Sequence, residues 1–447
     1  MKRYNQITKI VITVTSLLFS AQLFAVEFEY TVFSVLRHSD NLAQNNAQLS
    51  GNAFNLGGSF NFENDNQEYW SINFAGELSR EWFSIDSLDE QDRKRALASI
   101  EYDSPSSNFE FLLRGDYSQA PRDRFAVEDV GNLVDVNIAT ARPSYFFNIT
   151  PLDLINLEIT YLESSREGQD VDIIGQESFD FVNISKEVRY EKIINSTSEL
   201  SLVFDNVITR FNQDSAGTDF DQDNLFLRWV GRGKFNQIQV EVGKSRVTDN
   251  VGEDFDLKLF NILYSRQINS ANSIGINLRN SVNFIVSESF IENSINVDDQ
   301  VGNFGNAQEV ESANITYTMT GDLFSSDIQM SHANYQNLNG TSREKRLGAG
   351  LTVTYSLSQY FSTAPQTNIR FVFQKNKNTF ENESGVDIDN DVVLYTAQFN
   401  YFASESLSYY VQWLKRDASS TSLTSAFLSG DANGLSVGFV FSPANNR

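Results

Sequence analysis

The sequence predicts an all-β protein, a transmembrane antiparallel up-and-down β-barrel of about 18 to 20 strands, with 20 as the best count. Three observations predict it. Apolar and polar residues alternate over stretches of roughly ten residues, which is the length of a membrane-spanning strand. The connections between these stretches are alternately long and short. The last stretch ends in an aromatic residue. Together these features are typical of bacterial outer-membrane barrels, with short periplasmic turns and long extracellular loops.

The chain opens with a basic segment followed by an apolar run at 10–19, and this order predicts a secretory signal peptide over residues 1–25. The run is too short for a transmembrane helix, which needs about 20 apolar residues. Residues 26–447 are then expected to form one barrel domain. Because its first strand should begin almost at Val26, no plug domain of the TonB-dependent transporter type is expected ahead of it.

The connections give the strand count. Ten long, acidic or Asn-rich connections fall near 38–51, 86–92, 120–133, 166–178, 213–223, 249–255, 288–308, 337–343, 379–391 and 418–432. Nine short ones lie between them, at 63–66, 104–107, 150–153, 194–197, 232–234, 269–272, 321–323, 358–365 and 403–405. Strict interleaving of the two kinds implies 20 strands, and with an even count both chain termini lie on the periplasmic side.

Individual strands show which face each residue takes. In 109–114, the apolar residues Phe109 and Leu113 alternate with Glu110 and Arg114, and the same period of two recurs at 155–161, 238–242, 274–279 and 393–400. Aromatic residues gather near strand ends, as expected for the interfacial girdles of a barrel. Pro143 falls inside a predicted strand, where it is expected to mark a bulge or a strand end.

The same alternation assigns a set of charged residues to the lumen: Glu110, Arg114, Arg142, Glu158, Glu187, Arg189, Arg228, Glu241, Arg279 and Arg370. Two interpretations fit their mixed signs. Opposed arginine and acidic walls could form a constriction that orients a passing solute. Alternatively, the charges only satisfy one another as cross-strand pairs.

Composition excludes several classes of protein. The formal net charge of −24 argues against nucleic acid as a partner, because such binding needs a basic surface. An aromatic content of 13%, with 36 Phe and 17 Tyr, is too high for a disordered chain. The absence of cysteine from the sequence excludes disulfides and thiol catalysis.

No constellation predicts catalysis. The two histidines, His38 and His332, have serine as a sequence neighbour, but adjacent residues of a strand point to opposite faces. The sequence therefore predicts no enzyme, no catalytic residue and no cofactor. Aspartates at every second position in 219–223 and 387–391 resemble part of a calcium loop, but the glycine and distal glutamate of an EF-hand are missing. We expect these aspartates in solvated extracellular loops and predict no metal site.

Two segments carry more specific signals. The last strand, 435–441, ends at Phe441 and looks like the signal read by the outer-membrane assembly machinery. The first strand leads into Arg37-His38-Ser39-Asp40-Asn41-Leu42. This step, followed by Phe/Tyr-rich hairpins, resembles the outer-membrane β-barrel proteins of exopolysaccharide and exosortase (PEP-CTERM) loci, of the beta-barrel porin 2 type. The resemblance implies a role in surface polysaccharide export or assembly, and no catalytic residues.

The sequence thus predicts a protein of the bacterial outer membrane that forms a channel or export conduit, associated with surface polysaccharide secretion. A closed structural or adhesive barrel and a general diffusion porin are the alternatives. The expected partners are outer-membrane lipid and lipopolysaccharide, the barrel-assembly machinery, polysaccharide and periplasmic export components, with no nucleic acid.

Overall fold

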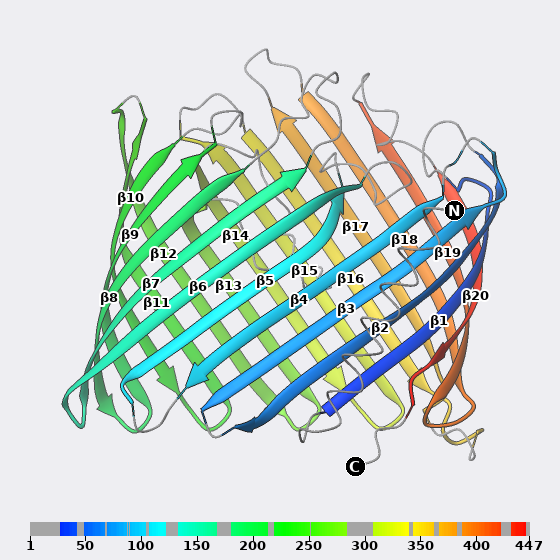
Figure 1. Cartoon of the computed structure of the whole chain (residues 1–447), viewed down its shortest axis with the longest axis horizontal. Coiled ribbons are helices and arrows are strands. Elements are labelled where there is room, and N and C mark those ends of the chain that lie inside the picture. The colour runs from blue at the N-terminus through cyan, green and yellow to red at the C-terminus, as the bar shows by residue number, and fades with distance from the viewer. Residues whose placement is uncertain are drawn as a thin grey trace, which may run out of the picture.

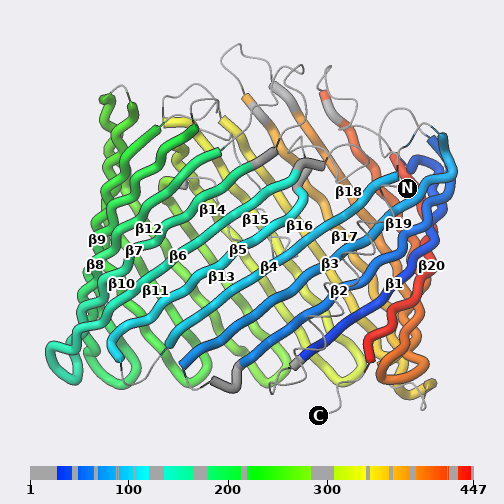
Figure 2. The backbone as a smooth tube through the Cα atoms, in the orientation of Figure 1, coloured from blue at the N-terminus to red at the C-terminus, as the bar shows by residue number. Residues whose placement is uncertain are grey.

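The chain forms a closed, antiparallel, 20-stranded barrel in which each strand pairs with its neighbours in sequence and β1 pairs with β20. The computed structural model describes residues 27–42, 49–67, 69–86, 88, 90–103, 107–121, 133–167, 180–212, 219–250, 252–283, 307–338, 343–361, 366–381, 387–421 and 431–443. Figures 1 and 2 show the strands tilted across the barrel wall, with the short turns gathered at the lower rim. The strand count and the barrel class predicted from the sequence are confirmed.

The strands are β1 (Glu27–Ser39), β2 (Gly51–Gln67), β3 (Trp70–Phe83), β4 (Gln91–Asp103), β5 (Phe109–Pro121), β6 (Leu133–Thr150), β7 (Asp153–Glu167), β8 (Phe181–Asn195), β9 (Ser198–Phe211), β10 (Phe220–Arg232), β11 (Asn236–Asp249), β12 (Asp254–Asn269), β13 (Asn272–Asn283), β14 (Gln308–Thr320), β15 (Phe324–Asn337), β16 (Arg343–Ser356), β17 (Asn368–Glu381), β18 (Asp387–Phe402), β19 (Leu407–Ser420) and β20 (Ala432–Phe441). Residues 1–26 lie outside the described part, so the signal peptide stays a prediction. Within the described part, no helix is long and apolar enough to cross a membrane.

Two kinds of boundary differ from the prediction. The turn expected at 63–66 is wrong, because the β1–β2 ladder continues to the pair Glu27 and Glu63 and β2 ends only at Gln67. The acidic segments expected as loops are partly strand, since β10 begins at Phe220 and β18 at Asp387. In each case the strand continues through polar residues, because strand ends beyond the apolar band need no apolar side chain. A polar stretch alone therefore does not show where a strand ends.

Pro143 does not act as expected either. β6 runs through it without a shift of register, since Ala141 pairs with Tyr161 and Ser144 with Glu158. The expectation of a bulge or strand end at Pro143 is therefore wrong. Proline has no N–H to donate, and the intact pairs on either side keep the strand in register.

The Ser39-Asp40-Asn41 step closes the barrel. Here β1 and β20 pair over Val32–Ser39 and Gly434–Phe441. Just beyond, the Asp40 carboxylate accepts a 2.6 Å hydrogen bond from the Asn433 backbone N–H, and the Asn41 side-chain amide donates to the Asp431 carbonyl at 3.0 Å. Asn41 is buried. The motif on which the family resemblance rests thus joins the first strand to the last.

Candidate functional site

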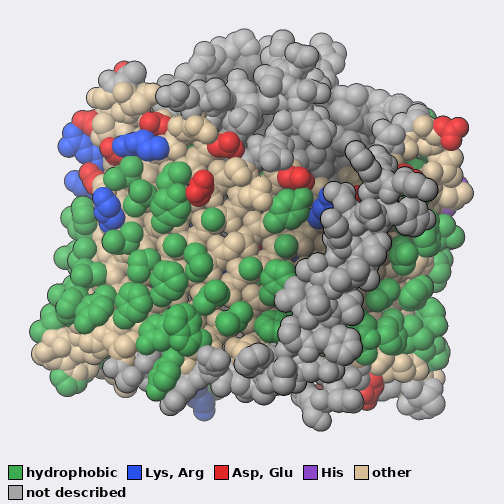
Figure 3. Space-filling view, viewed as in Figure 1, with side chains coloured by type: hydrophobic (Ala, Val, Ile, Leu, Met, Phe, Trp, Pro, Cys, Tyr) green, Lys and Arg blue, Asp and Glu red, His purple; other side chains and the backbone are tan. Residues whose placement is uncertain are grey.

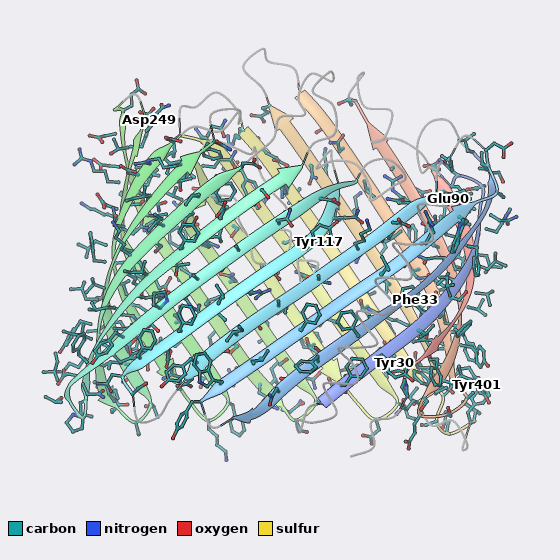
Figure 4. All side chains as sticks on the ribbon, in the orientation of Figure 1. Tyr30, Phe33, Glu90, Tyr117, Asp249 and Tyr401 are labelled. Carbon is teal, nitrogen blue, oxygen red and sulfur yellow. The ribbon has the colours of Figure 1, made fainter. Side chains whose placement is uncertain are left out.

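The outer face of the barrel is identified by its exposed apolar side chains. On β10, Leu225, Leu227 and Trp229 are 53%, 42% and 37% exposed, and the residues between them point to the interior. Figure 3 shows hydrophobic side chains covering the lower part of the visible face, with charged side chains above them. Figure 4 places Asp249 at the rim of the long connections and Tyr401 at the opposite rim. The barrel therefore has an apolar band on its outside and a polar wall inside.

The structure places all ten sequence-predicted lumen residues on the face opposite the exposed apolar side chains. Their part in transport stays a prediction. They do not form one cluster. Most of them lie along neighbouring strands from β5 to β13, and Arg370 lies apart on β17: Glu110 and Arg114 on β5, Arg142 on β6, Glu158 on β7, Glu187 and Arg189 on β8, Arg228 on β10, Glu241 on β11 and Arg279 on β13.

One row of the wall is acidic. Cross-strand pairing leads from Glu110 through Ser144 to Glu158, then to Glu187 and Asp205. Like charges directly opposite destabilise a sheet unless nearby groups compensate them. The row has such groups at both ends. Arg142 acts electrostatically on Glu110, and the Asp205 carboxylate accepts from the Ser185 hydroxyl at 2.6 Å and the Asn224 amide at 3.1 Å.

Arg189 lies one step along the wall from this row. Its Nε is 2.8 Å from Glu191 Oε1 and 3.5 Å from Glu187 Oε1. One guanidinium therefore serves two carboxylates, one of them in the acidic row. Asp205 and Glu191 were missed by the sequence analysis, although the alternation in their own strands puts both on the inner face.

A second row has alternating sign. Arg228 Nε donates to Glu241 Oε1 at 2.5 Å, and the two side chains are 24% and 16% exposed. Glu241 also accepts from the side-chain amides of Gln239 at 2.9 Å and Asn261 at 3.0 Å. The Arg228 guanidinium lies 5.5 Å from the centroid of the Phe226 ring. This carboxylate is thus held by three donors, and the wall neutralises its own charge here.

Three of the predicted arginines are not held in this way. Among the described residues, Arg142, Arg279 and Arg370 have no carboxylate within ion-pair distance, and Arg142 and Arg370 are exposed although they face the interior. Near Arg279 the wall has a depression of about 300 Å³, whose lining includes Glu241 and Asn277. The interior therefore offers solvent-accessible cations beside acids and amides.

In another part of the inner wall, charged side chains are buried. On β16, Arg346 Nε lies 2.8 Å from Glu344 Oε1, and both side chains are only 3% exposed. The Arg346 guanidinium stacks on Tyr335, 4.5 Å from its ring centroid, and Tyr335 packs with Val310 and Ala333. The sequence analysis missed this pair. The alternation of Arg346 with the outward Leu347 could have found its face but not its burial.

Among the described residues, no nucleophile and base come together around either histidine. His38 Nδ1 lies 2.9 Å from Asn52 Oδ1, and His332 Nδ1 lies 3.2 Å from the Arg346 carbonyl. Both histidines share the outward face of their strands with exposed apolar residues. In the part of the chain that is described, no group of three His, Cys, Asp or Glu residues is arranged to hold a metal ion.

The expectation that the spaced aspartates lie in loops holds for Asp219, which precedes β10, and is wrong for the aspartates that follow it in 219–223 and for those of 387–391. Asp221 and Asp223 lie in β10, and Asp389 and Asp391 lie in β18. Each faces a donor on a neighbouring strand: Asp221 pairs with Arg210 at 2.7 Å, Asp223 accepts from Asn206 at 2.8 Å, and Asp389 and Asp391 pair with Lys377 at 3.7 Å and Lys375 at 3.5 Å. They therefore belong to cross-strand pairs.

No family model matches the chain, and no curated protein matches it. Among solved structures it is similar to the FrpB iron transporter from Neisseria meningitidis. The F5-1 variant superposes with a TM-score of 0.51 at 8% identity, over 93% of this chain and 82% of that one. The F3-3 variant gives 0.50 at 8% identity over the same shares. What the two proteins share is the fold. The resemblance to exopolysaccharide barrels stays a prediction beside it.

Proposed function

We propose that this protein is an outer-membrane channel through which hydrophilic solutes pass, without chemistry, along the inner wall of the barrel. One observation carries the proposal. Arg142 and Arg370 face the inside of a closed barrel and are nevertheless exposed, so the interior is wet beside them. A polar, solvated wall inside an apolar outer face is the arrangement of a membrane pore.

The membrane location has its own support. Large apolar side chains are exposed on strand after strand, which is costly in water and favourable in lipid. Aromatic pairs lie near the short-turn rim, with ring centroids 4.7 Å apart for Trp70 and Tyr102 and 4.6 Å apart for Tyr145 and Phe147. Such pairs suit a bilayer interface. We therefore assign the short turns to the periplasm and the long connections to the outside.

The cargo we propose is a surface polysaccharide on its way out. Carboxylates, guanidinium groups and amides along the wall, such as Glu241, Arg279 and Asn277, can exchange hydrogen bonds with a hydroxyl-rich chain. The Ser39-Asp40-Asn41 step supports this cargo only through the family resemblance, because here it contacts β20 and not the lumen. A general diffusion porin is the broader form of the same proposal.

One observation favours a second function, that of a closed structural or adhesive barrel. The pair Glu344 and Arg346 is buried against Tyr335 on the inner wall, so that part of the interior is filled. If the filling extends across the barrel, no solute passes and the function lies at the outer surface.

A planar-bilayer experiment separates these functions. We compare the wild type with R142Q/R370Q, which removes two inward cations, and with K375Q/K377Q, which removes two outward ones. The channel proposal predicts conductance steps for all three, with the reversal potential in a salt gradient shifted toward cation selectivity only for R142Q/R370Q. Added acidic polysaccharide should block the steps.

Each failure has a separate meaning. Folding is first verified by the heat-modifiable mobility of each protein. A folded wild type without steps would overturn the channel and favour the closed barrel. If R142Q/R370Q has conductance steps with the same reversal potential as the wild type, the ions do not pass along this part of the wall. If added polysaccharide does not block the conductance steps, the protein is a general porin and the proposal of a polysaccharide cargo is wrong.

A further inference from the structure

Two lysines face each other on the outside of the barrel. Lys244 on β11 is the direct cross-strand partner of Lys258 on β12, and both are exposed. They share the outward face with the next pair down the strands, Val242 and Phe260, which are 51% and 39% exposed. In the connection between these strands, Gly252 adopts a φ of 84°, which few residues other than glycine tolerate.

Neither lysine is neutralised by the protein within its described residues, where no carboxylate lies within ion-pair distance of either ammonium group. The nearby acids belong to another cation. Arg246, one step above Lys244, bonds to Asp254, and Asp256 and Asp223 act on it electrostatically. Directly opposite residues have Cβ atoms about 5 Å apart, and like charges at that separation destabilise the sheet. The lysine pair therefore lacks an anion.

Other outward lysines show that this is not the rule for the chain. On β17, Lys375 lies 3.5 Å from Asp391 and Lys377 lies 3.7 Å from Asp389. These two lysines are 51% and 44% exposed, so an outward lysine that is open to solvent can still form an ion pair with the protein. The β17 pair is a matched control for the β11–β12 pair.

The height of the lysines on the barrel indicates which anion they take. Leu225, 53% exposed, is the cross-strand neighbour of Lys244 on the other side, and Val242 and Phe260 lie directly below. Above the lysines the outward residues of β11 and β12 are charged or polar: Arg246, Thr248, Asp254 and Asp256. In Figure 3 charged side chains also gather above the hydrophobic ones. The lysines thus lie at the upper edge of the apolar band.

We propose that Lys244 and Lys258 bind the phosphate of an outer-leaflet lipid, a phosphorylated lipopolysaccharide, whose acyl chains cover the apolar residues below. The proposal rests on the membrane location proposed above. Each ammonium supplies three donors, so two of them can hold one phosphate between the strands. An anion with an attached apolar tail fits better than free phosphate, because Leu225, Val242 and Phe260 offer the tail a surface in the same place.

Binding to the full-length protein in detergent tests this directly. Phosphorylated lipopolysaccharide is titrated against the wild type, K244Q/K258Q and the control K375Q/K377Q, with dephosphorylated lipopolysaccharide and inorganic phosphate as separate probes. We expect K244Q/K258Q to bind the phosphorylated lipid about tenfold more weakly than the wild type and the control. That difference should vanish with the dephosphorylated lipid, and inorganic phosphate should not distinguish the variants.

Equal affinity of K244Q/K258Q and the wild type for the phosphorylated lipid would overturn the site. So would an equal loss in K375Q/K377Q, since any outward lysine would then do. If inorganic phosphate also binds the wild type more tightly than K244Q/K258Q, the site binds free anions and the lipid proposal is wrong. The bilayer experiment is independent of these results, because channel steps with an intact reversal potential in K244Q/K258Q would uphold the channel even if the lipid site failed.

Discussion

The two faces of β11 differ in whether the protein supplies a counterion for their charged side chains. On the inner face, Glu241 is held by Arg228 and by two amides, so the wall supplies the counterion. On the outer face, Lys244 stands opposite Lys258 with no described carboxylate in range. On this strand the protein itself compensates the inward charge, whereas a charge at the membrane edge can be compensated by lipid.

The difference explains why one strand needs both arrangements. Its inner carboxylate, Glu241, keeps its three donors whether or not a solute is present. Under the proposed lipid site, its outer Lys244 gains an anion only in the membrane, so lipid binding would stabilise the folded barrel by mass action. The comparison predicts that breaking the inner pair costs stability in any medium, while removing an outer lysine costs stability only when lipid phosphate is present.

The largest effect is expected for E241Q. The change removes the charge that neutralises Arg228 and leaves that guanidinium largely buried in the wall, since it is only 24% exposed. We expect the free energy of unfolding to fall by about 1–3 kcal/mol. Denaturant unfolding followed by tryptophan fluorescence, in detergent and in lipid, measures it.

The control for E241Q is D417N, which breaks the outward pair of Lys415 and Asp417, 2.9 Å apart with exposures of 40% and 39%. Exposed pairs contribute little, so the loss should stay below about 0.5 kcal/mol. Equal losses in E241Q and D417N would contradict the proposed difference between the faces.

A smaller effect, of opposite sign, is expected for K258E. The new carboxylate would lie opposite Lys244 and replace repulsion by attraction, so the protein should gain roughly 0.5 kcal/mol in phosphate-free detergent. The same variant should lose its binding of phosphorylated lipopolysaccharide. Unfolding and lipid titration on one preparation give both numbers.

K258Q serves as the intermediate for K258E, because it removes the repulsion and adds no attraction. Its stability should fall between those of the wild type and K258E. A loss of stability in K258E without lipid would show that the two lysines do not repel one another, and the comparison of faces would fail on its outer side.

The sequence could predict the face of each of these residues but not its partners. Period-two alternation is a local pattern, so the sequence could predict the inward faces of Arg228 and Glu241 and the number of strands. The ion pair of Arg228 with Glu241 depends on the register between β10 and β11, and the burial of Arg346 depends on what packs inside the barrel. Both are properties of distant segments. The acidic stretches misled for a related reason, since Asp221 and Asp389 are strand residues whose basic partners lie on other strands.

The smallest effect concerns the one outward cation of β11 that the protein neutralises itself. Asp254 lies three outward pairs beyond Val242 and Phe260, at the tip of the hairpin and outside the apolar band. Hydrogen bonds from Arg246 and then Thr248 hold the pKa of Asp254 below its ordinary value of 3.8. Because the folded-state pKa is lowered, the stabilisation is present above that ordinary value and is lost as the pH falls through the lowered one.

Thermal unfolding of the wild type and D254N between about pH 6 and pH 3 tests this contribution. The wild type should be slightly more stable near pH 6, and the difference should shrink as acid protonates Asp254. R246Q should remove the same difference, and the double variant should add nothing to either single one, because each breaks the same bond. A difference that persists undiminished at the acid end would mean that the tip is held by something other than this ion pair.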